Sequence, residues 1–255
     1  MLHEAKVVGI IQARMGSSRL PGKVLLPLAG KPVLTHVIER LERCETIDEL
    51  VVATSSEVKD DPIVSLCEAA GVSAYRGSEH DVLERYWEAA TAHKADWVVR
   101  ITADCPAIDS GIVDEVVRRA VREHWDCFGL GGSFPNGLDC TVYSYAALSH
   151  ANDAATLNSD REHVGPFIIR NYGAGSYEPF SALGHLRFTL DEPADYEVLK
   201  RIFESLGAAG NYFSGADIVA FLSNHAEITA LNSHIIRNEG YLTSVAQDKR
   251  SLENH

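Results

Sequence analysis

The chain has 255 residues, of which 45% are hydrophobic and 23% charged, and its formal net charge is −13 at pH 7. The length and composition are typical of one large α/β domain, and so acidic a surface would repel duplex nucleic acid. No segment approaches the roughly 20 apolar residues that cross a bilayer, and the N-terminus leads straight into a strand without a signal peptide. We therefore expect a cytoplasmic protein with no membrane insertion and no nucleic-acid partner.

The five cysteines are widely spaced and form no CxxC pair. An odd number at such spacing favours reduced, buried thiols and indicates neither a disulfide framework nor a zinc site.

Buried strands and amphipathic helices alternate through the first half of the chain. Short apolar runs predict strands and a helical period of apolar residues predicts helices. In chain order these are strand 7–12, helix 31–41, strand 49–54, helix 61–70, strand 72–76, helix 81–93, strand 97–101 and helix 110–123. Ser78 is a candidate cap for the third helix. This alternation predicts right-handed βαβ units in a mostly parallel sheet, within a Rossmann-like, three-layer α/β/α fold.

The pattern loosens after residue 125. Residues 128–139 are rich in glycine and predict a loop, 141–148 a strand entering a helix, and 159–172 a short helix followed by a strand. A late strand is predicted at 185–190 and an amphipathic helix at 194–206. The tail from about residue 214 is predicted to be helical and then frayed. We expect the irregular region at about 127–184 to carry acceptor recognition and dimer contacts.

A cationic loop follows the first strand, at the sheet edge where parallel α/β folds bind ligands. Arg14, Arg19 and Lys23 lie within ten residues of one another, and Gly16 and Gly22 allow the backbone to approach a ligand closely. Forked guanidinium donors and a compact ammonium suit the charge of several phosphates. The alternative is a solvated basic loop. The loop matches neither the Walker A pattern nor the GxGxxG fingerprint.

Two aspartates end strands at the same predicted edge. Asp104 directly follows the strand at 97–101, and Asp191 directly follows the strand at 185–190. Carboxylates there are suited to Mg²⁺, which is usually shared with substrate phosphates. Either residue alone is open to another interpretation, because an aspartate can cap the next helix. Asp109 is better placed for that role than Asp104, whereas Asp191 stands just before Pro193.

The segment SDREH at residues 159–163 is open to two interpretations. Arg161 and His163 would either meet an acidic acceptor or pair with surface carboxylates, and the second is favoured. The sequence contains no GxSxG elbow, so covalent catalysis by a serine nucleophile is not indicated.

Several motifs carry a family resemblance, which covers the chain from residue 7 to about 203. ARMGSSRLPGKVL at residues 13–25 resembles the signature AxxGSxRLPGKxL of the sugar-acid cytidylyltransferases, the CMP-KDO and CMP-sialic acid synthetases. The segments RGSEHDVLERY, RITADCP, REHVGPFIIRN and TLDEPADYE are similar, in the same order, to the spore coat polysaccharide biosynthesis protein F branch of that family. Two segments depart from the CMP-KDO pattern: this chain has ADCP for GDEP and GSEHDVLER for SGTER, which leaves the acceptor and some base contacts open.

The resemblance implies one nucleotidyltransferase domain over residues 1–255, in a homodimer, that couples CTP to an acidic sugar or similar acidic small molecule and releases pyrophosphate. It implies Mg²⁺ as cofactor and a role in surface polysaccharide or glycoconjugate biosynthesis. By this likeness Arg14, Arg19 and Lys23 hold the triphosphate with Gly16 and Ser17, Asp104 and Asp191 bind the metal, and the nucleoside lies near Ala13, Arg76, Gly77 and Ser78.

Two other functions remain open from the residues alone. One is a glycosyltransferase that uses a nucleotide sugar, although such enzymes usually carry a DxD pair and TADCP has one aspartate. The other is a non-catalytic nucleotide-binding protein of a polysaccharide pathway.

Overall fold

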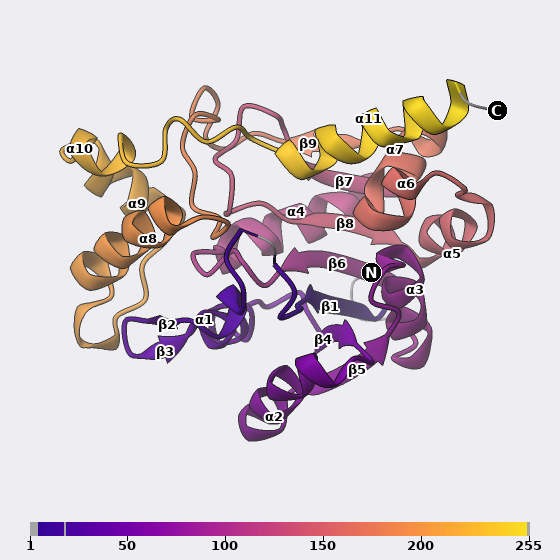
Figure 1. The fold of residues 1–255 in the computed structure, drawn as a ribbon, viewed down its shortest axis with the longest axis horizontal. Coiled ribbons are helices and arrows are strands. Elements are labelled where there is room, and N and C mark those ends of the chain that lie inside the picture. The colour runs from indigo at the N-terminus through magenta and orange to yellow at the C-terminus, as the bar shows by residue number, and fades with distance from the viewer. Residues whose placement is uncertain (1–4, 18, 254–255) are drawn as a thin grey trace.

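Seven strands form one sheet in the computed structural model, which describes residues 5–17 and 19–253 (Figure 1). The strand order is β5-β4-β1-β6-β8-β7-β9, and only the pairs that involve β8 are antiparallel. The strands are β1 Val7–Gln12, β4 Glu49–Ser55, β5 Ser73–Gly77, β6 Trp97–Thr102, β7 Cys127–Leu130, β8 Thr141–Ser144 and β9 Gly175–Tyr177; a separate hairpin joins β2 Pro27–Leu28 to β3 Lys31–Pro32.

Helices cover both faces of the sheet. They are α1 Val33–Leu41, α2 Asp61–Ala70, α3 Val82–Ala92, α4 Ser110–Glu123, α5 Tyr145–Ala154, α6 Asn158–His163, α7 Gly165–Tyr172, α8 Pro193–Leu206, α9 Gly215–Leu222, α10 Ala226–Thr229 and α11 Glu239–Glu253. The mostly parallel sheet between two helical layers confirms the predicted three-layer α/β/α fold. None of the helices in the described part of the chain is long and apolar enough to span a membrane.

The two helical layers pack on opposite faces because successive side chains of a strand point to opposite sides. Ile11 and Ile101 belong to the core shared with α1, α4 and α8. Ile10 and Val98 belong to the core shared with α3, α5 and α7. By this alternation Gln12 and Arg100 also lie on the α3 side of the sheet, where Ile10 pairs with Arg100 in the parallel ladder.

Helix caps follow simple side-chain chemistry. Asp109 accepts hydrogen bonds from the backbone N–H groups of Gly111 and Ile112 at the start of α4, as expected. The cap of α3 is Asp81, which accepts from the N–H of Glu84, and Ser78 instead accepts from the N–H of Asp81. The prediction that Ser78 caps this helix is therefore wrong by one turn.

Two predicted strands are not strands. Residues 159–172 form the helices α6 and α7, because a short apolar run such as Phe167–Ile169 does not distinguish helix from strand. Residues 185–190 are extended, but their only ladder contact within the described residues is an isolated bridge between Asn136 and Arg187. Leu190 instead donates its N–H to the carbonyl of Asp104, which stands just beyond the end of β6.

Both late regions of the chain are more ordered than predicted. The region 127–184 contributes β7, β8 and β9 to the same central sheet. The tail ends in α11, a helix of 15 residues that lies beside α6 (Figure 1). Asp248 in α11 accepts the backbone N–H groups of Asn158 and Ser159 at the start of α6, so the last helix is docked and not frayed.

Candidate active site

The cationic loop after β1 is held by a buried carboxylate. Asp60, which is fully buried, accepts the N–H of Met15 at 2.7 Å, and the carbonyl of Met15 accepts the N–H of Gly22 at 3.0 Å. Gly22 has a φ of 70°, a left-handed conformation that a glycine adopts without steric cost. These bonds fold the loop back on itself and bring Lys23 over the carboxyl ends of the strands.

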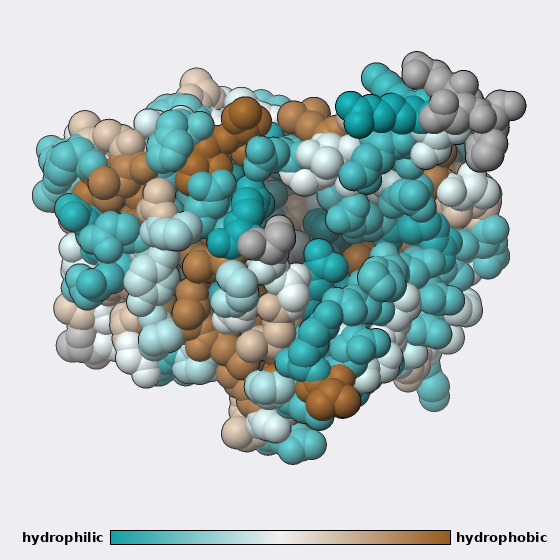
Figure 2. All heavy atoms as spheres, viewed as in Figure 1, coloured by the Kyte–Doolittle hydropathy of each residue, from teal (hydrophilic) through white to brown (hydrophobic). Residues whose placement is uncertain are grey.

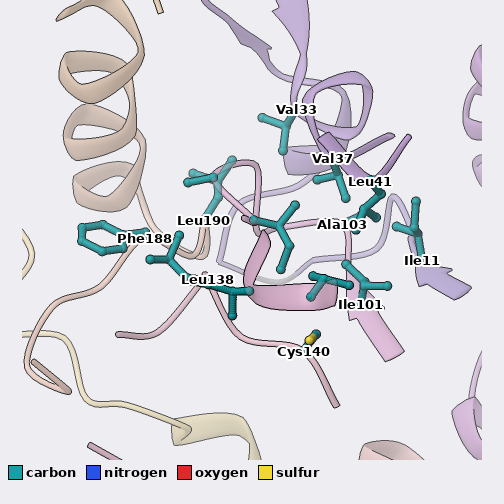
Figure 3. Packing of buried hydrophobic residues seen from close by; sticks show 14 of the residues in the cluster. Ile11, Val33, Val37, Leu41, Ile101, Ala103, Leu138, Cys140, Phe188 and Leu190 are labelled. Atoms are coloured by element: carbon teal, nitrogen blue, oxygen red, sulfur yellow. The ribbon is translucent and has the colours of Figure 1, made fainter. Parts of the chain in front are cut away.

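The two metal-ligand candidates meet at Lys23. Its Nζ lies 2.6 Å from Oδ2 of Asp104 and 2.8 Å from Oδ1 of Asp191. Leu190, the residue before Asp191, donates its backbone N–H to the carbonyl of Asp104 at 2.8 Å. This bond links the two chain segments that carry the carboxylates. Ala103, Leu138 and Leu190 are all buried and belong to the same apolar core, part of which Figure 3 shows. The apolar core thus fixes the spacing of the two aspartates.

The charges of this cluster reinforce one another. Burial alone would raise the pKa of the Asp104 carboxyl, but the adjacent Lys23 ammonium outweighs it and lowers that pKa to about 2. Burial likewise lowers the pKa of Lys23, and the carboxylates of Asp104 and Asp191 outweigh it, so the pKa of Lys23 is raised. At neutral pH Lys23 is therefore an ammonium and Asp104 a carboxylate.

A second ion-pair network holds Asp191 in place. Arg187 donates from Nη2 to Oδ2 of Asp191 at 2.6 Å and from Nε to Oδ1 of Asp195 at 2.9 Å. Asp195 is fully buried and also accepts the backbone N–H groups of Asp191 and Glu192. Glu192, not Asp191, is the N-cap of α8, with Pro193 in its first turn. Asp191 is therefore free of the capping role and faces Lys23.

A cavity of about 540 Å³ opens beside this cluster. Figure 2 shows a hollow lined by hydrophilic residues in this face of the molecule. Besides the loop and the two aspartates, the lining comprises Gln12, Val24, Val82, Arg100, Thr102, Ala103, Glu162, His163, Glu239, Gly240, Thr243, Ser244 and Gln247. A smaller cavity of about 260 Å³ adjoins it, and Arg100, Asp104 and Asp191 line both cavities.

Most of the site residues predicted from sequence line the larger cavity. They are Arg14, Gly16, Ser17, Arg19, Lys23, Asp104 and Asp191. Residues that are 168 positions apart, such as Lys23 and Asp191, are thereby brought into contact. The predicted phosphate loop and the predicted metal ligands form one site.

The residues predicted near the nucleoside do not line it. Ala13 is buried, and its N–H already bonds the carbonyl of Ala53. The Arg76 guanidinium bonds the carbonyls of Ser55 and Glu57, and Ser78 bonds the start of α3. Gly77 accepts the N–H of Ser56. The contact of these groups with a nucleoside stays a prediction.

Sequence reasoning missed several lining residues. Arg100 and Gln12 carried a signal, because a charged or amide side chain inside a buried apolar strand is unusual and needs a partner. The residues of α11 carried none, since nothing local marks a distant amphipathic helix as part of a site. Arg161 pairs with Asp81 at 2.6 Å, as the structural interpretation expects.

His163 belongs to the site, unlike its neighbour Arg161. It lines both cavities, and its Nε2 lies 3.1 Å from Oγ of Ser244 in α11. Burial lowers the pKa of His163, so the ring is neutral at neutral pH. Val164 follows with a φ of 66°, a strained conformation for a β-branched residue, and turns the chain from α6 into α7.

A carboxylate at the start of α11 pairs with one of the loop cations and would compete with a phosphate for it. Glu239 accepts from Nη1 of Arg19 at 3.0 Å, and Arg19 also lies 3.3 Å from Asp191. Both Arg19 and Glu239 are partly exposed to solvent. A phosphate that approaches Nη1 of Arg19 therefore competes with the Glu239 carboxylate.

We expect the Glu239→Gln variant to bind a nucleoside triphosphate about two- to fivefold more tightly than the wild type, because it removes that competing carboxylate, and exposed ion pairs contribute at most about 1 kcal/mol. Calorimetric titration at low salt measures the difference, which should shrink as ionic strength rises. The exposed Glu68→Gln variant, outside the site, is the control. Unchanged or weaker binding by Glu239→Gln would contradict the competition.

The donor set fits a divalent cation shared with a substrate. No cluster of three or more histidine, cysteine or acidic side chains that would hold a metal occurs within residues 5–17 and 19–253. Asp104 and Asp191 supply two carboxylates that converge on one ammonium. Mg²⁺ binds through one or two carboxylates together with substrate phosphates and water, so two carboxylates suffice.

Comparison with known proteins agrees with the fold. A family model described as cytidylyltransferase matches residues 8–173. The chain is 30% identical over 233 residues to the spore coat polysaccharide biosynthesis protein SpsF of Bacillus subtilis (strain 168), covering 87% of this chain and 95% of that protein. It is 39% identical over 215 residues to the mitochondrial 3-deoxy-manno-octulosonate cytidylyltransferase of Arabidopsis thaliana, covering 77% and 72%.

One solved structure covers nearly the whole chain. A cytidylyltransferase from Leptospira borgpetersenii serovar Hardjo-bovis (strain JB197) superposes with a TM-score of 0.85 at 31% identity, covering 92% of this chain and all of that one. The sheet and its loop-and-carboxylate site define a nucleotidyltransferase. More specifically, the chain belongs to the cytidylyltransferase family and is a CTP-dependent nucleotidyltransferase. The resemblance seen in the sequence motifs is thereby confirmed.

Proposed function

We propose that this protein transfers CMP from CTP to an acidic sugar, or a similar acidic small molecule, with Mg²⁺ and with release of pyrophosphate. The observation that carries the proposal is the cluster in which Lys23 bridges Asp104 and Asp191, in a cavity that Arg14 and Arg19 also line. A triphosphate needs cations and a shared metal, and the cluster offers both kinds of partner.

The loop would hold the triphosphate through several cations. Arg14 lines the cavity and has no ion pair with a described residue, so its guanidinium is available to a phosphate. Arg19 and Lys23 would exchange carboxylate partners for phosphate oxygens when the nucleotide binds. Backbone N–H groups near Gly16 would add hydrogen bonds to the same oxygens.

The carboxylates would hold the metal. Asp104 and Asp191 would hold Mg²⁺, which would supply neutralisation of the charge on the phosphates. The chain itself would then align an acceptor oxygen with the α-phosphorus of CTP for direct displacement of pyrophosphate. Lys23 and Arg19 would stabilise the charge that moves to this leaving group. No covalent enzyme intermediate is required.

The biological role and the oligomeric state are proposed from the relatives of this chain. We propose a role in surface polysaccharide or glycoconjugate biosynthesis, because one relative is named for spore coat polysaccharide biosynthesis. We further propose a cytoplasmic location, and a homodimer as the family resemblance implies. Light scattering on a size-exclusion column tests the dimer, and a monomer mass would reject it.

Selective binding of CTP is the prediction that tests this function first. Calorimetric titration with CTP, ATP, GTP, UTP and dTTP, each with and without Mg²⁺, requires no knowledge of the acceptor. We expect CTP to bind best, and Mg²⁺ to strengthen its binding because the metal joins the phosphates to the two aspartates. A panel of acidic sugars that includes 3-deoxy-manno-octulosonate then identifies the acceptor by pyrophosphate release.

Two outcomes would count against the proposal. A preference for another nucleotide would keep the loop as a phosphate site but change the donor. An absence of binding by all five nucleotides would reject the function.

A further inference from the structure

Arg100 lines the site but belongs neither to the ion pairs around Lys23 nor to those around Asp195. It lies within β6, the strand that ends just before Asp104, and lines both the larger and the smaller cavity. Among the described residues it has no hydrogen bond and no ion pair, and its Nε is buried without a partner. Its guanidinium does face the ring of Tyr86, whose centroid lies 5.9 Å away.

A guanidinium whose Nε is buried without a partner is costly. An arginine stays charged in proteins, and a buried donor without a hydrogen bond is destabilising, more so when it belongs to a charged group. An aromatic ring attracts the cation but accepts no conventional hydrogen bond from it. Asp104 and Asp139 attract Arg100 through space, but neither bonds it. The group is thus prepared for an anion that enters from a cavity.

The other cations of the smaller cavity already have partners. Arg187 is bonded to Asp191 and Asp195, and Arg19 is bonded to Asp191, Glu192 and Glu239. Carboxylates outnumber the available cations there, so an anionic molecule would be repelled without a free positive charge. Arg100 supplies that charge beside Asp104.

We propose that Arg100 binds the acidic group of the acceptor, a carboxylate or a phosphoryl group, in the smaller cavity; this inference rests on the proposed cytidylyl transfer. The triphosphate already has three cations in the loop, whereas the acceptor has none. The two Nη groups of a guanidinium make a fork that fits two oxygens of such an anion. The anion would fix the acceptor beside Asp104, where the larger and smaller cavities meet.

Small anions serve as probes, because the acceptor itself is unidentified. Pyruvate and inorganic phosphate are titrated calorimetrically into wild-type protein, Arg100→Gln and Arg100→Lys, each saturated with CTP and Mg²⁺. We expect at least one anion to bind the wild type, to bind Arg100→Gln about tenfold more weakly or worse, and to bind Arg100→Lys with an intermediate affinity. The affinity for CTP should stay within about twofold of the wild type in Arg100→Gln.

Controls separate this site from the phosphate loop. Arg119→Gln, on the surface of α4, should change neither affinity, and Arg14→Gln should weaken CTP but not the anion. The inference is overturned if neither anion binds the saturated wild type, if Arg100→Gln binds the anion as well as the wild type, or if Arg100→Gln loses CTP instead. Unchanged near-ultraviolet circular dichroism excludes misfolding, and Arg100→Lys keeps the test valid if Arg100→Gln does not fold.

The same titrations without nucleotide separate the two proposals. If CTP fails to bind, the proposed function is rejected. Loss of anion binding by Arg100→Gln but not by Arg14→Gln, on nucleotide-free protein, would then still support an anion subsite at Arg100.

Discussion

The Asp104→Asn variant is expected to lose turnover by about a thousandfold or more while keeping its fold. An amide cannot supply the negative charge that binds Mg²⁺, and the charge stabilisation from such a metal amounts to several kcal/mol of barrier, at about 1.4 kcal/mol for each factor of ten. The substitution would also leave Lys23 with a single carboxylate partner, Asp191. The size of the side chain and the backbone bonds at this position are otherwise unchanged.

Two measurements check this expectation. The first needs no acceptor: the strengthening of CTP binding by Mg²⁺ should disappear in Asp104→Asn. The second is pyrophosphate release with the acceptor that the panel of acidic sugars identifies. Asp153→Asn, an exposed aspartate in α5, is the control and should behave as the wild type. Near-normal turnover in Asp104→Asn would remove Asp104 from the mechanism.

The Asp195→Ala variant is expected to be the most destabilised single variant, by about 3–5 kcal/mol of unfolding free energy. Removing one partner of a buried ion pair leaves the other charge uncompensated. Asp195 accepts from Arg187, from Asn232 and from the N–H groups of Asp191 and Glu192, so all these donors lose a bond together. Arg187 is itself buried and retains only Asp191.

Urea denaturation of both variants and the wild type measures the loss. The chain offers a matched control in Asp217, which occupies the same third helical position in the capping box of α9 but is exposed. Asp217→Ala should destabilise far less. A loss below about 1 kcal/mol in Asp195→Ala, the range of an exposed ion pair, would show that the network is not a stability element.

The same variant tests how Asp191 is positioned. Because Asp195 holds both the backbone of Asp191 and the arginine that pairs with it, its removal should also weaken the effect of Mg²⁺ on CTP affinity at temperatures where the variant is folded. A normal Mg²⁺ effect in folded Asp195→Ala would show that Asp191 is held without this network.

Local sequence determined most of the central fold. The boundaries of β1, α2 and α4 match the predictions: β1 is a short apolar run that ends at a glycine-containing loop, and the apolar residues of α2 and α4 repeat with a helical period. The loop with Arg14, Arg19 and Lys23, and the position of Asp104 after a buried strand, were also readable from sequence. In parallel sheets the carboxyl ends of strands share one edge, so local order implied that these groups would meet.

Other features depended on contacts between distant segments. Residues 185–190 have the composition of a strand, but their backbone bonds go to Asn136 and Asp104, so no ladder forms. Asp191 lies in the site because Lys23 contacts it. The local sequence also allowed Asp191 to cap α8, but in the structure Glu192 is the N-cap. Nothing in the sequence of α11 signals that Glu239 would bond Arg19. Period and propensity act within a few residues, whereas these contacts are set by the packing of the whole chain.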